Sequence, residues 1–105
     1  MKPIFDSTLD IQRRIYENKK RNGFNVSDIP LEFCLTSGEL AEAFEAYRKD
    51  SNTLGEELAD IVIYLLGIAE ICGGIDLGIE INKKMYKNER RVYKVDKNGV
   101  PTRIE

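Results

Sequence analysis

The chain contains no histidine and no tryptophan among its 105 residues. Without an imidazole, histidine-based acid–base catalysis and histidine metal ligation are excluded. Helical di-iron bundles built on Glu-x-x-His pairs are excluded for the same reason, although their carboxylate spacing is otherwise similar. Catalysis or metal binding must therefore rely on other side chains.

Cysteine is scarce as well, with only Cys34 and Cys72 and no CxxC pair. Each lies within an apolar segment of helical spacing, so we expect both to be small core residues. The longest apolar run, Ile61 to Ala69, is far too short to span a membrane. No signal peptide is visible. We therefore expect a cytoplasmic protein with no membrane partner.

An excess of one charge is also missing, since 16 Lys and Arg oppose 18 Asp and Glu for a net charge of −2. That balance gives no electrostatic case for nucleic-acid binding. A hydrophobic content of 42% and a charged content of 32% fit a globular chain. We expect one all-α domain over residues 1–105, with a loose lead-in at 1–6, a helical core at about 8–91 and a tail at 92–105.

Four helices are predicted from apolar periodicity and from residues that favour helix ends. Thr53-Leu-Gly-Glu56 indicates a capping box at the start of the third helix, and Pro30 suits the first turn of the second. Phe24, just after the first helix, is expected to fold back into the core. The expected helices start at Ser7 or Thr8, at Ser27 or Asp28, at Thr53 and at Asp76, and end near Asn22, Lys49, Cys72 and Arg91.

The tail changes character after the fourth helix. Residues 92–95 alternate like a strand, Asn98-Gly99 is a hairpin turn signal, and residues 100–104 return as an edge strand because Pro101 excludes a central one. We therefore expect a short C-terminal β-hairpin or an extended tail. Since an isolated hairpin is marginally stable, it is expected to pack on the helices or on a neighbouring chain.

Two acidic pairs stand out at the centre of the chain. Glu39 and Glu42 lie in the second predicted helix, and Glu57 and Asp60 lie in the third. The i,i+3 spacing places both acids of a pair on one helix face. If the helices fold back on each other, the four carboxylates meet, and their repulsion favours a divalent cation with oxygen ligands, such as Mg²⁺.

Acidic i,i+3 pairs are also common on solvated helix faces. Here, however, Glu57 and Asp60 share an arc of the third helix with Ile61, Tyr64 and Ile68, so the acids extend an apolar stripe. From spacing alone, a solvated face and a metal site both remain open.

Two further features concern the third and fourth helices. The third helix is apolar almost all round beyond Asp60, which points to a partner subunit in so small a chain. In the fourth, an apolar stripe continues into Lys84, Asn88 and Arg91. These residues form either a basic wall for an anionic, metal-bound ligand or a solvated helix end that favours cations.

The ExxE and ExxD pairs, followed by the K-x3-N-x2-R pattern at Lys84, Asn88 and Arg91, resemble the MazG-like family of nucleoside triphosphate pyrophosphohydrolases. The resemblance implies a four-helix bundle assembled as a homodimer or as a tetramer of two dimers. It also implies a housekeeping enzyme of the nucleotide pool that uses Mg²⁺, with Mn²⁺ as a substitute, to cleave a (d)NTP into a (d)NMP and pyrophosphate.

The resemblance also implies roles for residues of this chain. Glu39, Glu42, Glu57 and Asp60 would be the catalytic and metal-binding acids, and one of them, or a metal-bound hydroxide, would take the proton from water. Lys84 and Arg91 would neutralise phosphate oxygens, and Asn88 would orient phosphate or sugar.

Base recognition is less defined by the sequence. Gln12, Asn22 and Phe24 are conceivable contacts, but each also has a simpler structural explanation. Two alternatives to the triphosphate enzyme remain. One is a hydrolase of the same fold that acts on a modified nucleotide or a non-nucleotide phosphoanhydride. The other is a non-catalytic helical dimer or adaptor.

Overall fold

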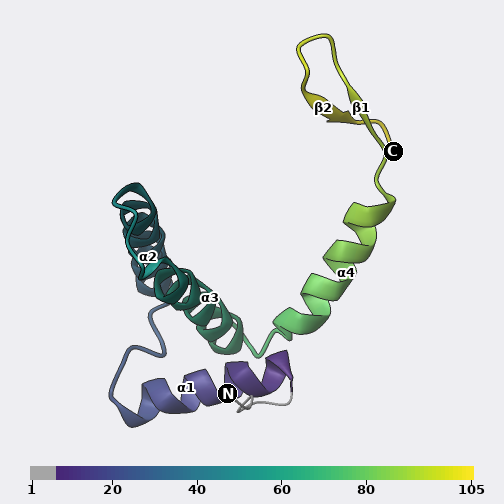
Figure 1. Cartoon of the computed structure of the whole chain (residues 1–105). Helices are drawn as coiled ribbons and strands as arrows, with labels where there is room; N and C mark the ends of the chain where they lie inside the picture. The colour runs from purple at the N-terminus through teal and green to yellow at the C-terminus, as the bar shows by residue number, and fades with distance from the viewer. Residues whose placement is uncertain (1–6) are drawn as a thin grey trace.

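The structure, a computed structural model, describes residues 7–105, so the expected lead-in at residues 1–6 lies outside the described part. Four helices are followed by a two-stranded antiparallel hairpin (Figure 1). The prediction of an all-α chain with a C-terminal hairpin is therefore confirmed. The elements are α1 (Thr8–Arg21), α2 (Ile29–Arg48), α3 (Leu54–Ile71), α4 (Leu77–Arg90), β1 (Tyr93–Val95) and β2 (Pro101–Arg103).

Three helices begin at side-chain caps that the sequence predicts. Ser7, Asp28 and Asp76 each accept a hydrogen bond, 3.1 Å long, from the backbone N–H three residues further on. Each cap satisfies one of the backbone donors that a helix start leaves without a partner. Gly23, with φ of 71°, ends the turn after α1, as the Asn22-Gly23 signal predicts.

The start of α3 is predicted correctly, but the capping box is wrong. Thr53 has φ of −92° and ψ of 2°, not the extended backbone that a side-chain cap needs, and its side chain makes no capping hydrogen bond. Its hydroxyl instead lies 2.8 Å from the Ser51 hydroxyl. The backbone alone begins the helix, because the Thr53 carbonyl accepts from the Glu57 N–H at 3.0 Å.

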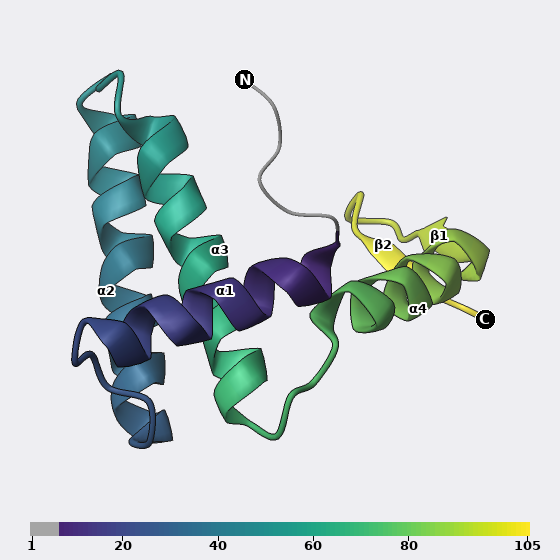
Figure 2. The ribbon, with the colours of Figure 1, turned by 90° about the horizontal axis from the view of Figure 1, so that it is seen from below.

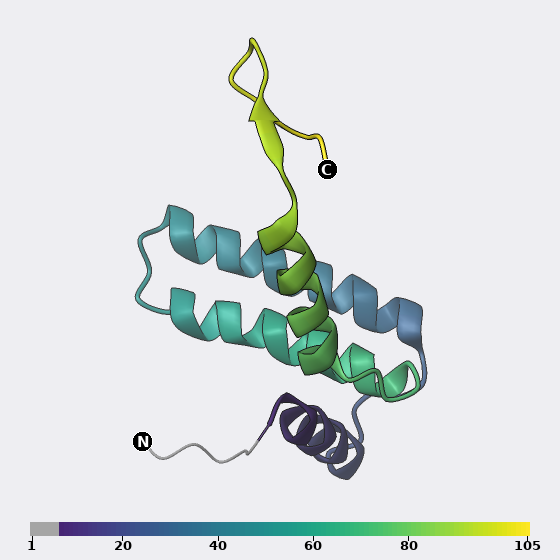
Figure 3. The same cartoon turned by 90° about the vertical axis from the view of Figure 1, so that its right-hand side faces the viewer.

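α2 and α3 form a helical hairpin and run side by side (Figure 3), and α1 crosses it (Figure 2). The buried hydrophobic core of residues 7–105 is small and lies within this hairpin. It consists of Ala43, Ala46, Leu66, Ile68 and Ala69. Many larger apolar side chains, such as Leu40, Phe44 and Tyr47, are exposed in the single chain.

Two expectations about small or aromatic core residues are wrong for this chain alone. Cys34 is exposed, and Phe24 is 60% exposed instead of folding into the core. Phe24 lies in the connection between α1 and α2, outside any helix, so helical periodicity does not place it, whereas Cys34 lies on α2. The periodicity shows which face of a helix is apolar, but α1 crosses the α2–α3 hairpin without covering all of it (Figure 2).

A buried glutamine fixes α1 to the connection between α3 and α4. Gln12 is fully buried, and its amide nitrogen donates to the Ile75 carbonyl at 2.6 Å. Its amide oxygen accepts from the Leu77 N–H at 2.7 Å. Beside it, Gly78 allows the start of α4 to approach α1, because a Cβ at this position would lie 2.8 Å from the Cβ of Thr8.

α4 makes its main contact with α1 and leads away from α2 and α3 (Figure 1). The predicted four-helix bundle is therefore not closed within one chain. The radius of gyration is 17.2 Å, against about 13 Å for a compact domain of this length. Beyond its contact with α1, the described part of the chain does not cover the apolar side of α4.

The hairpin continues outward from α4. Tyr93 pairs with Arg103, Lys94 with Thr102 and Val95 with Pro101, and all six residues are exposed. Because these strand residues are exposed in the single chain, packing of the hairpin on a neighbouring chain stays a prediction. Within residues 7–105, no helix is both long enough and apolar enough to cross a membrane.

Candidate metal centre

The α2–α3 hairpin brings three of the four predicted acids together. Glu39, Glu42 and Glu57 each offer a carboxylate oxygen, and these oxygens lie within 4.8 Å of one another. Asp60, one turn further along α3, is exposed and outside this group of three. The i,i+3 spacing on each helix and the tight turn between the helices produce this arrangement.

The electrostatics of the group follow from this closeness. Burial raises the pKa of Glu39 most, and the charges of Glu42, Asp60 and Glu57 and a hydrogen bond to the Glu42 side chain raise it further. Burial also contributes most to the raised pKa of Glu57, followed by the charges of Glu42, Asp60 and Glu56. A cation placed among these carboxylates would remove both the repulsion and the cost of desolvation.

One carboxylate oxygen of the group differs from the others in its hydrogen bonding. Glu39 Oε2 is buried and has no hydrogen-bond partner in the part of the chain that the structure describes. Leaving such an acceptor without a partner costs about 1–3 kcal/mol or more. The donor set consists of carboxylate oxygens alone, which suits a hard cation such as Mg²⁺. The residues present therefore fit a divalent metal.

The predicted basic residues lie elsewhere in the single chain. Lys84 and Asn88 are exposed on α4, and Arg91 follows directly after it. Arg91 Nη1 donates to Asn88 Oδ1 at 3.0 Å, so these two side chains do meet. Because α4 diverges from the α2–α3 hairpin (Figure 1), one chain does not bring them to its own acids.

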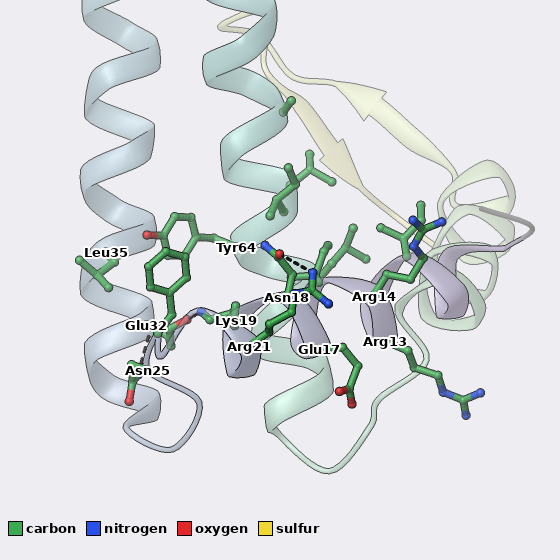
Figure 4. Close-up of a pocket in the computed structure, with 17 residues that line it drawn as sticks. Arg13, Arg14, Glu17, Asn18, Lys19, Arg21, Asn25, Glu32, Leu35 and Tyr64 are labelled. Atoms are coloured by element: carbon green, nitrogen blue, oxygen red, sulfur yellow. Dashed lines mark hydrogen bonds and ion pairs between the residues drawn. The ribbon is translucent and has the colours of Figure 1, made fainter. Parts of the chain in front are cut away.

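A cavity of about 1150 Å³ opens where α1 meets the α2–α3 hairpin (Figure 4). Its walls include Phe24, Glu32, Tyr64 and the Lys19 side chain. Burial raises the pKa of the Tyr64 hydroxyl most, and the charges of Glu39, Asp60 and Glu42 raise it further. Tyr64 therefore lines the cavity and is also within the electrostatic influence of the acids.

The three conceivable base contacts have different surroundings. Gln12 is fully buried and occupied by structural hydrogen bonds. Asn22 caps α1, and its side-chain amide donates to the Asn18 carbonyl at 2.8 Å. Only Phe24 lines the cavity. For Gln12 and Asn22, the structure thus favours the simpler structural role.

Two residues of this region, Lys19 and Glu32, are not predicted by the sequence pattern. They form an ion pair in which the Glu32 side chain is 1% exposed and the Lys19 side chain 12%. Each occupies a helix end where its charge already suits the dipole, so nothing in the local sequence indicates burial. The Lys19-Lys20-Arg21 run indicates a basic helix end but does not show which lysine is buried.

Comparison with known protein families identifies the family of this chain. The sequence model of the MazG nucleotide pyrophosphohydrolase domain matches residues 35–95, which is more than half of the chain. The chain belongs to the MazG family. No curated protein and no solved structure matches the chain significantly.

The MazG match contains all seven predicted site residues, from Glu39 to Arg91, and ends at β1. It supports a nucleotide pyrophosphohydrolase type of activity, and the family generally depends on a divalent metal. The match excludes α1 and the first turn of α2, where Lys19 and Glu32 lie. The cavity wall built from α1 is therefore a feature of this chain outside the MazG match.

Proposed function

We propose that the protein is a Mg²⁺-dependent nucleoside triphosphate pyrophosphohydrolase that converts a (d)NTP and water into a (d)NMP and pyrophosphate. The observation that carries the proposal is the meeting of Glu39, Glu42 and Glu57 across the α2–α3 hairpin, with one buried Glu39 oxygen left without a partner. The cytoplasm, where nucleoside triphosphates are made and used, is the proposed place of the reaction.

The acids would bind the metal and activate water. Glu39, Glu42 and Glu57, joined by Asp60, would hold one or more divalent ions, with Mn²⁺ as a substitute. When bound, the metal offsets the charge of the polyphosphate and aligns it with the attacking water. One of the four carboxylates would accept the proton of that water while the bond between the α and β phosphates breaks.

The basic residues would come from a second copy of the chain. Lys84 and Arg91 would neutralise non-bridging phosphate oxygens, and Asn88 would orient phosphate or sugar. Support for an assembly comes from α4, which leads away from its own α2–α3 hairpin, and from the many apolar side chains left exposed. We propose a homodimer, or a tetramer of two dimers, in which each chain is one domain over residues 1–105.

The test is pyrophosphate release from a panel of canonical and modified NTPs and dNTPs, with and without Mg²⁺. Glu57→Gln is expected to abolish release. Glu45→Gln is the matched control, because Glu45 lies on α2 beside Arg48 and Lys49, at 3.7 Å from each, and outside the acidic group. We expect Glu45→Gln to retain full activity.

The alternatives give different results in the same experiment. Silence across the panel, with Mg²⁺ still raising the melting temperature, would point to another phosphoanhydride as substrate. Silence with no effect of Mg²⁺ on melting would point to a non-catalytic helical protein. Release that survives Glu57→Gln would contradict the proposed role of the acids.

A further inference from the structure

A buried ion pair joins α1 to α2 outside the acidic group. Lys19 Nζ bonds to Glu32 Oε1, and the Asn25 amide donates to Glu32 Oε2 at 3.2 Å. Burying two charges costs several kcal/mol per ion before their attraction offsets it. Stability alone therefore does not explain why so small a protein contains this ion pair.

The path of the Lys19 side chain gives that explanation. Its stem passes Gly67 on α3, where a Cβ would lie 3.8 Å from Lys19 Cδ. Its ammonium group lies 5.4 Å from the centre of the Tyr64 ring, within the range of a cation–π interaction. In Figure 4, the side chain of Tyr64 reaches from α3 toward α2, near the end of Lys19. The ion pair therefore holds the Tyr64 ring from one side.

Tyr64 is also related to the acids by its place on α3 and by their charges. Tyr64 follows Asp60 by one helical turn, so the two side chains share a face of α3. The charges of Glu39, Asp60 and Glu42 all act on its hydroxyl group. Within residues 7–105 that hydroxyl makes no hydrogen bond, and Tyr64 lines the cavity. The neutral Tyr64 hydroxyl is thus a hydrogen-bond donor without a partner in the described chain, and the nearby charged groups are carboxylates, which accept hydrogen bonds.

We propose that Tyr64 is a further substrate-contacting residue, whose hydroxyl donates a hydrogen bond to a non-bridging phosphate oxygen of the nucleotide, and that the Lys19–Glu32 pair positions its ring. The inference rests on the proposed function. A lysine at this place would pair with the carboxylates and compete with the metal. A tyrosine hydroxyl stays neutral and remains available as a donor to an incoming polyphosphate.

Tyr64→Phe is the direct test, because it keeps the ring and removes only the donor. We expect kcat/KM for pyrophosphate release to fall roughly 10- to 100-fold, with an unchanged melting temperature and an unchanged Mg²⁺ affinity measured by calorimetry. Tyr16→Phe is the matched control, because Lys20 lies at the same 5.4 Å from the Tyr16 ring on α1, away from the acids. It should leave kcat/KM unchanged.

The positioning role needs a second set of variants. Lys19→Met combined with Glu32→Gln removes both buried charges together, so neither is left without a partner. We expect this double variant to lower kcat/KM in the same direction as Tyr64→Phe. Adding Tyr64→Phe to the double variant should then cause no further loss, because both changes remove one interaction. Losses that multiply would show that the pair acts independently of Tyr64.

Failure of the inference and failure of the proposed function are distinguishable. If the unaltered protein hydrolyses a triphosphate and Tyr64→Phe does so equally well, the inference is overturned and the function stands. If Tyr64→Phe loses Mg²⁺ affinity in parallel with activity, the hydroxyl serves the metal site and not the substrate. If the unaltered protein releases no pyrophosphate from any nucleotide, both proposals are overturned.

Discussion

The carboxylate oxygens of Glu39 on α2 and Glu57 on α3 lie within 4.8 Å of each other across the helical hairpin. Both groups have a raised pKa, mainly through burial and then through neighbouring charges. A carboxyl group whose pKa is higher in the folded state stabilises the fold below its unfolded pKa. That stabilisation is lost as the pH rises through the folded value.

The first prediction concerns the metal-free protein. Its melting temperature in EDTA should fall as the pH rises from about 4.3, the ordinary pKa of glutamate, through the raised values of Glu39 and Glu57. Glu39→Gln should raise the melting temperature at neutral pH and flatten this dependence, because it removes a repelling charge. Thermal melts by circular dichroism across the pH series measure both effects. A parallel downward shift of the whole curve would contradict the prediction.

The second prediction concerns the same acids with Mg²⁺ bound, when they should raise the stability of the protein instead of lowering it. Saturating Mg²⁺ should raise the melting temperature of the unaltered protein, by an amount equivalent to about 2.7 kcal/mol at a hundredfold excess over Kd. Glu57→Gln should be at least as stable as the unaltered protein in EDTA, yet gain little from Mg²⁺. Glu45→Gln should gain as much as the unaltered protein. Equal Mg²⁺ gains in all three proteins would refute metal binding at the acids.

The acids also show which features of the structure can be predicted from the sequence alone. Three of the four helix starts follow from local capping residues, and the acidic group follows from i,i+3 spacing on two helices joined by a turn. The ion pair of Lys19 and Glu32 does not follow, because its burial depends on where α1 crosses the hairpin. That crossing is set by contacts between residues distant in the chain.

The direction of α4 is beyond sequence reasoning for a similar reason. Its periodicity identifies an apolar side but not the chain that covers it, so the sequence predicts a four-helix bundle in an oligomer but not that α4 leads away from its own α2–α3 hairpin. Phe24 illustrates the same limit, since its hydrophobic character predicts burial while the structure leaves it at the cavity wall.

A third prediction tests the buried glutamine. Gln12→Met keeps the volume but leaves the Ile75 carbonyl and the Leu77 N–H without their partners. Two unsatisfied buried groups should lower the free energy of unfolding by about 2–6 kcal/mol in total. Urea unfolding followed by circular dichroism measures the change. Because Gln12 is given no contact with the nucleotide, KM of the folded variant should stay unchanged, and a selective rise in KM would reveal a role in binding.

A fourth prediction concerns the exposed apolar side chains. Phe44 on α2 is 58% exposed in the single chain, and in the proposed assembly a second copy would cover it. Phe44→Lys should therefore reduce the mass in solution toward that of one 12.0 kDa chain, because an unpaired charge in an apolar interface is costly. Light scattering coupled to size-exclusion chromatography measures the mass. Glu45→Gln, which is also the control for activity, should leave the mass unchanged.

The final prediction contrasts two helical glycines. A Cβ at Gly78 would lie 2.8 Å from the Cβ of Thr8, whereas a Cβ at Gly38 meets no atom within 4 Å in the described chain. Alanine normally stabilises a helix interior by about 1 kcal/mol relative to glycine. Gly78→Ala should instead destabilise by about 1–3 kcal/mol, because α4 would be forced away from α1. Gly38→Ala should raise stability in the single chain. A loss of stability at Gly38 confined to the assembled protein would place a neighbouring helix against this face, one residue from Glu39, whereas a gain there would leave that face open.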